Sequence, residues 1–343
     1  MATPTQFPAL LVREAPAGET ERAVAAVETL CVGDLPPGDV LIDVACSSLN
    51  YKDALACQGH PGVAAKLPHV PGIDCAGVVR QCDSGHFSAG DAVLVTGYGL
   101  GSDAWGGYSG CVRVPAGWLL PLPAGLDARS AMTYGTAGFT AAQSVAALLA
   151  GGVEPGQGPV LVTGASGGVG VFSVAILAKL GFEVVAMSGK PDMAPPLATL
   201  GASRVIGRDA LPGGEGPLLK ATWAGGVDTV GGETLARLLR STRYRGCVAA
   251  CGLAASADLP LTVYPFILRG VTLAGIDSAK CPAGPRREVW EKLAGPWSVE
   301  LPPGLVTTID LDGVADRAAE MLAGKTRGRT LVMPRSSRPD EAG

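Results

Sequence analysis

Two patterns of hydrophobic and polar residues follow each other along this chain. From residue 7 to about residue 129, short apolar runs alternate with clusters of turn residues, which is typical of a β-rich unit with irregular loops. This pattern predicts a β-rich first domain. The apolar runs that we interpret as strands lie at residues 9–12, 40–45, 77–80, 92–96 and 110–114.

From about residue 130 the pattern changes to apolar strands separated by helical segments of about 10–15 residues, which indicates βαβ units and a parallel sheet. A helix is predicted over residues 169–180, between the first two strands. Six strands in this arrangement favour a doubly wound α/β sheet. The predicted strands lie at residues 160–163, 183–187, 204–206, 227–230, 247–251 and 272–275.

The end of the chain is expected to return to the first domain. Beyond Pro282 we predict a strand over 305–309, a helix near 313–323 and a strand over 330–333. A chain of 343 residues exceeds the size at which a single core stops growing, so two domains are expected. The predicted division is a discontinuous domain of residues 1–129 and 282–343, and an α/β domain of residues 130–281.

Composition and charge argue against several classes of partner. The formal net charge is −4 and the Lys and Arg residues are scattered, so no basic stripe is available for nucleic acid. No apolar stretch approaches the roughly 20 residues that cross a bilayer, and residues 1–13 lack the pattern of a secretory signal. The nine cysteines include no Cys-x-x-Cys pair, so we expect reduced thiols in a cytoplasmic protein.

A glycine-rich segment from Pro159 to Gly170 is the strongest motif, because an apolar strand leads through it into a helix. Glycines 164, 167, 168 and 170 allow a tight turn and bring backbone N–H groups close to a pyrophosphate, whose charge the helix N-terminus favours. An ordinary glycine-rich turn is the alternative. The strand and helix on either side favour dinucleotide binding.

The end of the next strand indicates which dinucleotide is bound. A carboxylate there would bind the ribose hydroxyls of NAD and repel the additional phosphate of NADP. The strand instead ends in Ser188, Gly189 and Lys190, which supply a hydroxyl, a close backbone approach and a cation. NADPH is therefore the predicted cofactor, with Arg208 as a candidate second cation, although a solvated loop lysine is the alternative for Lys190.

Several sequence blocks together resemble the medium-chain dehydrogenase/reductase superfamily, and within it the zinc-free quinone oxidoreductase group with its acrylyl-CoA reductase branch. The resemblance implies a GroES-like catalytic domain, a Rossmann domain, a cleft between them and commonly a homodimer. The blocks are Ser47-Ser-Leu-Asn-Tyr-Lys-Asp53, Pro71-Gly-Ile-Asp-Cys-Ala-Gly77, Gly90-Asp91, Trp105-Gly-Gly107, Gly135-Thr-Ala-Gly-Phe-Thr140, the glycine-rich segment, Leu200-Gly-Ala202 and Gly328-Arg-Thr-Leu-Val332.

Comparison within the superfamily also bears on metal binding. Zinc-dependent alcohol dehydrogenases have Gly-His-Glu where this chain has Gly72-Ile73-Asp74, so the metal-binding histidine is missing. The four-cysteine lobe of those relatives is also missing between Ser84 and Tyr108, and no metal is expected. Without a Lewis acid, the chemistry should use a substrate whose own conjugation makes its β-carbon electrophilic, such as an enoyl thioester or a quinone.

The resemblance also implies individual NADPH contacts. Near the C-terminus the relatives often have Asn where this chain has Gly324, so the side-chain contact of that Asn with NADPH is not carried over. The implied NADPH contacts are Tyr51, Ser166, Gly167, Gly168, Val169, Ser188, Gly189, Lys190, Arg208, Leu253, Ile267 and Ser278.

Asn50 and Tyr51 are the candidate catalytic residues, because the resemblance puts their loop against the nicotinamide. Tyr51 is a candidate to donate a proton or to hold the ribose and amide, and Asn50 to steady an enolate oxygen. Packing of Tyr51 under the cofactor without chemistry is the alternative. Lys52 and Asp53 are expected to form an ion pair at a helix start, and Asp74 is expected to be structural.

Three functions remain open from the sequence. The first is NADPH-dependent reduction of acrylyl-CoA to propanoyl-CoA, by hydride transfer to the β-carbon and protonation of the α-carbon. The second is NADPH:quinone reduction, and the third is NADPH binding without catalysis, since a fold does not fix a function. A CoA thioester requires cations for its phosphates, for which Arg286, Arg287 and Lys292 are candidates.

Overall fold

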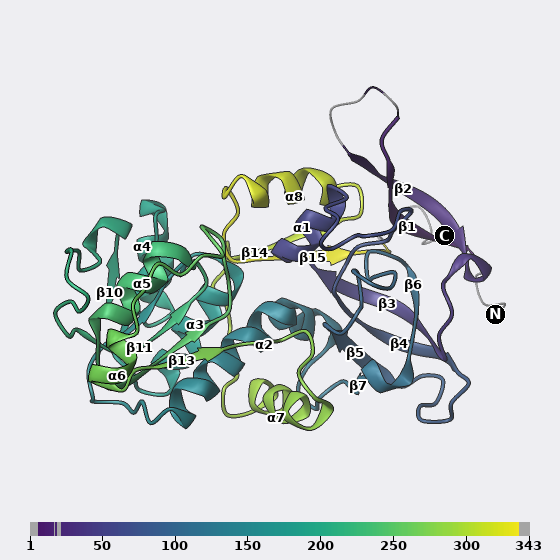
Figure 1. The fold of residues 1–343 in the computed structure, drawn as a ribbon. Coiled ribbons are helices and arrows are strands. Elements are labelled where there is room, and N and C mark those ends of the chain that lie inside the picture. Colours follow the sequence, from purple (N-terminus) through teal and green to yellow (C-terminus); the bar gives the residue numbers. More distant parts are fainter. Residues whose placement is uncertain (1–5, 17, 19–21, 336–343) are drawn as a thin grey trace. The chain divides into compact units, whose positions relative to one another are not determined.

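A computed structural model describes residues 6–16, 18 and 22–335 of the chain, which divides into two compact units (Figure 1). The first unit takes the described residues up to 136, residues 279–287, and those from 306 onward. The second unit takes residues 137–278 and 288–305. The division at 129/130 and 281/282 that the sequence suggested stays a prediction.

The first unit is β-rich, as predicted. Its main sheet has the strand order β14-β15-β3-β4-β5-β7, with β6 also paired to β3, while β1 and β2 form a separate antiparallel pair. The strands are β1 (Gln6–Glu14), β2 (Ala23–Cys31), β3 (Val40–Ser48), β4 (Asp74–Cys82), β5 (Ala92–Thr96), β6 (Cys111–Val114), β7 (Leu120–Pro121), β14 (Val306–Asp310) and β15 (Arg329–Met333).

Strand β3 shows how this sheet is covered on both faces. Val40, Ile42 and Val44 belong to one buried apolar cluster, whereas Leu41 belongs to another. Because successive side chains of a strand point to opposite faces, the two clusters lie on opposite sides of the sheet. Burial on both faces explains why this segment is a nearly continuous apolar run in the sequence.

Helices of the first unit contribute to the apolar cluster that contains Leu41. Helices α1 (Tyr51–Cys57) and α8 (Val314–Leu322) pack against each other (Figure 1), and short 3-10 helices cover Val32–Asp34 and Ala116–Trp118. Two longer helices belong partly to each unit, α2 (Ala128–Ala150) and α7 (Ala283–Ala294). Helix α2 is kinked at Gly135, whose φ of 49° is a conformation that glycine adopts without strain.

The second unit contains a six-stranded parallel sheet with the order β10-β9-β8-β11-β12-β13. This order is that of a doubly wound dinucleotide-binding fold, so the predicted fold class is confirmed. The strands are β8 (Val160–Val162), β9 (Val184–Met187), β10 (Arg204–Ile206), β11 (Trp223–Asp228), β12 (Thr242–Ala250) and β13 (Thr272–Gly275). The helices are α3 (Gly168–Lys179), α4 (Ala194–Thr199), α5 (Gly232–Ser241) and α6 (Tyr264–Arg269), with 3-10 turns at Pro191–Met193 and Arg208–Ala210.

Strand β11 differs from its prediction, because it begins at Trp223 and not at residue 227. Gly225 and Gly226 interrupt the apolar run that a strand of this sheet normally shows. A Cβ atom at Gly225 would lie 2.6 Å from the carbonyl oxygen of Cys247 on the neighbouring strand. Glycine stands here because two backbones approach closely, which a hydrophobic pattern cannot reveal.

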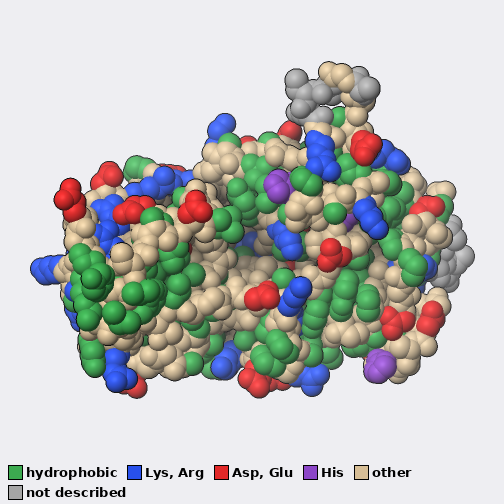
Figure 2. All heavy atoms as spheres, viewed as in Figure 1, with side chains coloured by type: hydrophobic (Ala, Val, Ile, Leu, Met, Phe, Trp, Pro, Cys, Tyr) green, Lys and Arg blue, Asp and Glu red, His purple; other side chains and the backbone are tan. Residues whose placement is uncertain are grey.

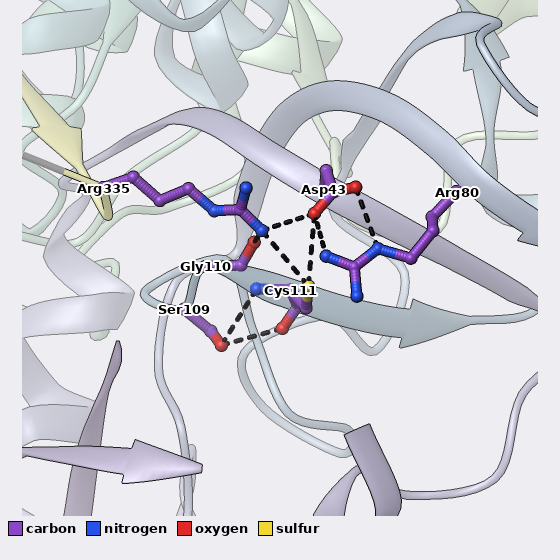
Figure 3. A network of polar contacts seen from close by, with 6 residues as sticks. All are labelled: Asp43, Arg80, Ser109, Gly110, Cys111 and Arg335. Carbon is purple, nitrogen blue, oxygen red and sulfur yellow. Dashed lines mark hydrogen bonds and ion pairs between the residues drawn. The ribbon is translucent and has the colours of Figure 1, made fainter. Parts of the chain in front are cut away.

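A polar network joins the last described residue, Arg335, to the sheet of the first unit (Figure 3). Arg335 bonds to the Asp43 carboxylate and donates to the Gly110 carbonyl oxygen at 2.9 Å. Arg80 donates to the other oxygen of Asp43 at 2.9 Å. Burial raises the pKa of Asp43, but the bonds from Arg80 and the charge of Arg335 outweigh burial and hold that pKa below its ordinary value.

The described residues also show the state of the cysteines and the character of the helices. All nine cysteines are free thiols. No helix in the part of the chain that the structure describes combines the length and the apolar character needed to cross a membrane.

Candidate active site

The turn between β8 and α3 has the geometry expected of the glycine-rich motif. Gly164 has a φ of +58°, and a Cβ atom at Gly170 would lie 2.4 Å from the Gly164 carbonyl oxygen. The first turn of α3 therefore packs directly on the end of β8. Gly167 is the residue that caps α3. Backbone N–H groups at this helix N-terminus are suited to binding a phosphate.

This turn is anchored to the strands on both sides of β8. Ala165 N donates to the Met187 carbonyl oxygen at 3.0 Å, and Thr163 Oγ1 donates to Asp228 Oδ1 at 2.6 Å. Asp228 also accepts from Gly231 N at 2.7 Å, and burial raises its pKa. Asp228 was not predicted, although an Asp that ends a buried strand shortly before two glycines is a sequence signal for such a turn.

A cavity of about 620 Å³ lies beyond the ends of β9 and β10. Ser188, Gly189, Lys190 and Arg208 all line it, so the structure brings together four of the predicted cofactor contacts. A Cβ atom at Gly189 would lie 2.9 Å from Arg208 Nε, which shows that the Arg208 side chain lies against the Gly189 backbone. Residues that carry a hydroxyl, an ammonium and a guanidinium therefore line one cavity, a combination that suits a phosphate. Asp209, which was not predicted, also lines the cavity.

Five other predicted cofactor contacts lie elsewhere in the second unit. Ser166 is 9% exposed in the glycine-rich turn, and Val169 lies in the first turn of α3. Leu253 follows β12 and is 61% exposed, Ile267 on α6 is 68% exposed, and Ser278 follows β13. None of these five residues lines the cavity formed by Ser188 and Arg208. Their assignment to the cofactor stays a prediction.

In the first unit, Asn50 lies in a buried polar network. Its Nδ2 atom donates to Asp74 Oδ2 at 2.7 Å and to Asp53 Oδ2 at 3.2 Å. Its Oδ1 atom accepts from Arg329 Nη1 at 3.2 Å. Both amide hydrogens of Asn50 are therefore directed at carboxylates inside the protein.

Asp53 connects the start of α1 to the loop before β4. Its Oδ2 atom accepts from the backbone N of Asn50 at 2.8 Å, and its Oδ1 atom accepts from Gly72 N at 3.1 Å and Ile73 N at 2.8 Å. The side chain is completely buried, and no ion pair joins it to Lys52 within the described residues. The predicted Lys52–Asp53 ion pair is wrong, because Asp53 points into the protein. Burial raises its pKa to about 7, and the Asp74 charge adds to the rise.

Asp74 has the structural surroundings that the sequence analysis expected. It accepts from Ser48 Oγ at 2.6 Å, from Thr136 N at 2.9 Å and from Thr136 Oγ1 at 2.5 Å. Arg329 is 2% exposed and donates to Ser48 Oγ at 2.8 Å. Burial lowers the pKa of Arg329, and the charge of Asp74 opposes that change. The network therefore contains a buried cation to balance its carboxylates.

Tyr51 differs from these neighbours because it is exposed. It is the first residue of α1 and its side chain is 46% exposed. The adjacent Asn50 is only 9% exposed. Of the two candidate catalytic residues, Tyr51 is thus the one whose side chain reaches solvent.

Arg286 does not have the exposure that binding a CoA phosphate requires. It is 1% exposed and donates to the Thr96 carbonyl oxygen at 2.6 Å and the Ala279 carbonyl oxygen at 3.0 Å. Its guanidinium lies 4.2 Å from the ring centroid of Tyr98. Arg286 is therefore structural, whereas Arg287 is exposed.

The residues at the position of the zinc site do not fit a catalytic zinc. Ile73 has no donor atom, and the carboxylate of Asp74 is already bound by Ser48, Asn50 and Thr136. Among the described residues, no group of three His, Cys, Asp or Glu side chains is arranged to hold a metal ion. No step of the proposed reaction below uses a metal.

Comparison with known proteins identifies two families. Residues 36–124 match the alcohol dehydrogenase GroES-like domain, and residues 168–295 match the zinc-binding dehydrogenase family. The chain is 48% identical over 315 residues to the probable acrylyl-CoA reductase AcuI of Escherichia coli (strain K12), covering 91% of this chain and 96% of that protein.

Two further proteins are similar over most of their length. The crystal structure of E. coli K-12 YhdH with bound NADPH matches with a TM-score of 0.89 and 46% identity, covering 95% of this chain and 100% of that one. The putative quinone oxidoreductase YhfP of Bacillus subtilis (strain 168) is 45% identical over 311 residues, covering 89% of this chain and 93% of that protein. A crystal structure of B. subtilis YhfP with NAD bound matches with a TM-score of 0.91 and 42% identity, covering 96% of this chain and 100% of that one. The chain therefore belongs to the medium-chain dehydrogenase/reductase superfamily, in the family that includes the AcuI acrylyl-CoA reductases.

Proposed function

We propose that this chain uses NADPH to reduce the activated C=C bond of a short enoyl-CoA, most specifically acrylyl-CoA to propanoyl-CoA. The observation that carries the proposal is the 48% identity, over nearly the whole chain, to a probable acrylyl-CoA reductase. The geometry of the second unit supports the nucleotide part of the proposal. The enoyl-CoA part rests on the relatives.

The residues of the second unit fit the pyrophosphate and the 2′-phosphate of NADPH. Gly164 and Gly170 shape the turn for the pyrophosphate, and Ser188, Lys190 and Arg208 surround the cavity for the 2′-phosphate. When bound, NADPH supplies a hydride. A structure of the relative YhfP has NAD bound, which lacks the 2′-phosphate. The cavity for the 2′-phosphate is therefore the feature to test in this chain.

Replacing Lys190 and Arg208 by Ala together removes two cations that face the cavity. Charge-assisted hydrogen bonds contribute about 1.5–3 kcal/mol each, so we expect NADPH to bind at least about tenfold more weakly. NADH lacks the 2′-phosphate, so its affinity should not change. Lys220→Ala, which removes an exposed lysine of the same unit, is the matched control. Equal loss for both nucleotides would contradict the assignment.

The reaction balances as acrylyl-CoA plus NADPH plus one proton giving propanoyl-CoA plus NADP⁺. The hydride goes to the β-carbon, the electron pair of the C=C bond moves to the thioester enolate, and a proton then goes to the α-carbon. The task of the protein residues is to orient the thioester and to supply that proton.

Tyr51 is proposed as the residue that holds or protonates the substrate. Its exposure supports this role, and the contacts of Asn50 support Tyr51 over Asn50, since donation from Asn50 to an enolate would break a bond to Asp53 or Asp74. Tyr51→Phe should lower kcat by about 100-fold or more if the hydroxyl transfers the proton. An unchanged kcat would leave Tyr51 a packing residue.

For the CoA phosphates we propose Arg287, because its exposure suits the role whereas Arg286 is buried. Lys292 is partly buried, with its ammonium 4.8 Å from the ring centroid of Trp297. Arg287→Ala should therefore raise the KM for a CoA thioester and leave the affinity for NADPH unchanged. A KM that does not change would exclude Arg287.

A second copy of the chain is the proposed partner protein. Strand β13 is at the edge of the parallel sheet, and exposed apolar side chains gather nearby over α6 (Figure 2). A homodimer would cover such an edge and patch. Light scattering tests this: the wild type should be a dimer and Ile267→Lys, a change at a 68% exposed position, should be monomeric.

We also propose a cytoplasmic location, which the nine free thiols support.

Two other functions are outcomes of the same assays. Turnover of a quinone without turnover of an enoyl-CoA would favour an NADPH:quinone oxidoreductase, the activity in the name of YhfP. Binding of NADPH without turnover of any acceptor would favour a non-catalytic NADPH-binding protein.

A further inference from the structure

A second cavity, of about 590 Å³, lies at the amino-terminal ends of the strands of the parallel sheet. It is lined near the starts of β11, β12 and β13, at Ala224, Gly246 and Thr272. The cavity formed by Ser188 and Arg208 lies beyond the ends of β9 and β10. Because all six strands are parallel, one cavity lies at their carboxyl ends and the other at their amino ends, so the two are separate sites. The volume is within the range of small-molecule sites.

Strand β12 loops outward to form one wall of this second cavity. Thr242 pairs with Trp223 and Cys247 pairs with Gly225, so residues 243–246 all lie opposite Ala224 alone. The looped segment contains Arg243, Tyr244 and Arg245. A regular ladder would have directed these side chains alternately to the two faces of the sheet.

The backbone of Arg245 is held in a conformation that is unfavourable for its residue type. Its φ is +59°, in the left-handed region, although the residue carries a full side chain. Strained residues of this kind gather at binding sites, where the position of a side chain outweighs its conformational cost. A Cβ atom at Gly270, which also lines the cavity, would lie 3.8 Å from Arg245 Cγ.

The side chains give this wall a positive charge and an exposed ring. Arg243 Nη1 donates to the Gln157 carbonyl oxygen at 2.5 Å, and the guanidinium of Arg245 lies 5.6 Å from the ring centroid of Tyr244. Tyr244 is 69% exposed. Of the residues that line the cavity, all in the described part of the chain, none is Asp or Glu. Two cations without a carboxylate stand out in a chain whose net charge is −4.

We propose that this cavity binds a phosphate group, as part of a small phosphate-bearing metabolite, through Arg243, Arg245 and the Tyr244 hydroxyl. Guanidinium groups match phosphate oxygens in pairs of parallel hydrogen bonds. The glycines of the other walls, Gly151, Gly152 and Gly270, allow a ligand to approach the backbone closely. The site is independent of the proposed reaction.

The test uses inorganic phosphate as the probe and thermal unfolding of the full chain as the readout. The parent protein carries Lys190→Ala and Arg208→Ala, so that phosphate bound by these two cations does not contribute. Phosphate should raise the Tm of this parent saturably, beyond the effect of NaCl at equal ionic strength. Adding Arg245→Gly should abolish the shift, adding Arg243→Gln should weaken it, and adding Arg22→Gln, which removes an exposed arginine of the first unit, should not alter it.

Arg245→Gly also distinguishes loss of binding from loss of folding. Glycine adopts a φ of +59° without strain, so without phosphate this variant should have a Tm equal to or above that of the parent. A phosphate shift that is absent, that does not saturate, or that persists in Arg245→Gly would overturn the proposal. Because NADPH takes no part in the assay, failure here is distinguishable from failure of the proposed reductase activity.

Discussion

Replacing Asp53 by Asn keeps the size and shape of a buried side chain but removes half of its acceptor capacity. The two oxygens of Asp53 accept from Asn50 N at 2.8 Å, Asn50 Nδ2 at 3.2 Å, Gly72 N at 3.1 Å and Ile73 N at 2.8 Å. Whichever way the amide of Asn is turned, its NH₂ group faces two of these N–H donors. Asn50 Nδ2 keeps its bond to Asp74, but one backbone N–H or more loses its acceptor.

The size of the effect follows from the burial of these groups. At pH 5.5 Asp53 is mainly protonated, but the hydroxyl oxygen of a carboxylic acid still accepts a hydrogen bond, whereas an NH₂ group does not. An unsatisfied buried donor costs about 1–3 kcal/mol, so at pH 5.5 we expect Asp53→Asn to lower the free energy of unfolding by about that amount. Asp34 is the matched control. It accepts from Cys31 N at 2.7 Å at the start of a 3-10 helix, but it is exposed. Water can replace that bond, so Asp34→Asn should cost about 1 kcal/mol or less.

The difference between wild type and Asp53→Asn should also depend on pH. Burial raises the pKa of Asp53 to about 7 in the folded protein, above the roughly 4 of an unfolded chain. Between these values the folded state binds the additional proton, so the stability that Asp53 contributes is fully present below about pH 4 and is lost as pH rises through 7. From pH 5.5 to 8 the wild type should lose about 2 kcal/mol relative to the variant.

Urea unfolding of wild type, Asp53→Asn and Asp34→Asn at pH 5.5 and pH 8 measures both quantities. The reasoning about hydrogen bonds is refuted if Asp53→Asn is as stable as wild type at pH 5.5. The reasoning about the raised pKa is refuted if the difference between wild type and Asp53→Asn is the same at both pH values.

Three further changes test other parts of the structure. Gly170→Ala puts a Cβ atom 2.4 Å from a carbonyl oxygen of the turn, so it should weaken NADPH binding at least about tenfold, by fluorescence titration, while circular dichroism stays that of a folded protein. Arg335→Ala should lower the Tm at pH 7 but not at about pH 2, because the lowered pKa of Asp43 gives stability that is lost as the pH falls through that pKa; an equal loss at both pH values would contradict this. Arg286→Lys removes buried hydrogen bonds and should lower the free energy of unfolding by about 3 kcal/mol, and a loss below about 1 kcal/mol would show that the bonds are not stabilising.

The parallel sheet of the second unit could be predicted from sequence because each of its strands has its own apolar pattern within a few neighbouring residues. Strands covered on both faces are continuous apolar runs, as in β8 and β9. The predicted grouping of Ser188, Lys190 and Arg208 followed from the same rule, since residues after adjacent parallel strands meet at the carboxyl ends of those strands. The structure brings these three residues to one cavity.

Other features depend on contacts between distant parts of the chain, which a local pattern does not contain. Strand β2 (Ala23–Cys31) is rich in alanine and was not predicted; its pairing with β1 makes it a strand. Asp53 was assigned to Lys52, its neighbour in sequence, but it bonds to Gly72 and Ile73. Arg329 reaches Ser48 and Asn50 across most of the chain, and no spacing rule predicts that.

NADPH-dependent reduction of acrylyl-CoA is measured by the oxidation of NADPH in the presence of acrylyl-CoA, crotonyl-CoA or a benzoquinone, offered separately, with NADH as the control cofactor. We expect fast turnover of acrylyl-CoA with NADPH, much slower turnover with NADH, and propanoyl-CoA as the product. Turnover of the quinone alone, or tight binding of NADPH with no turnover of any acceptor, would contradict the proposed function.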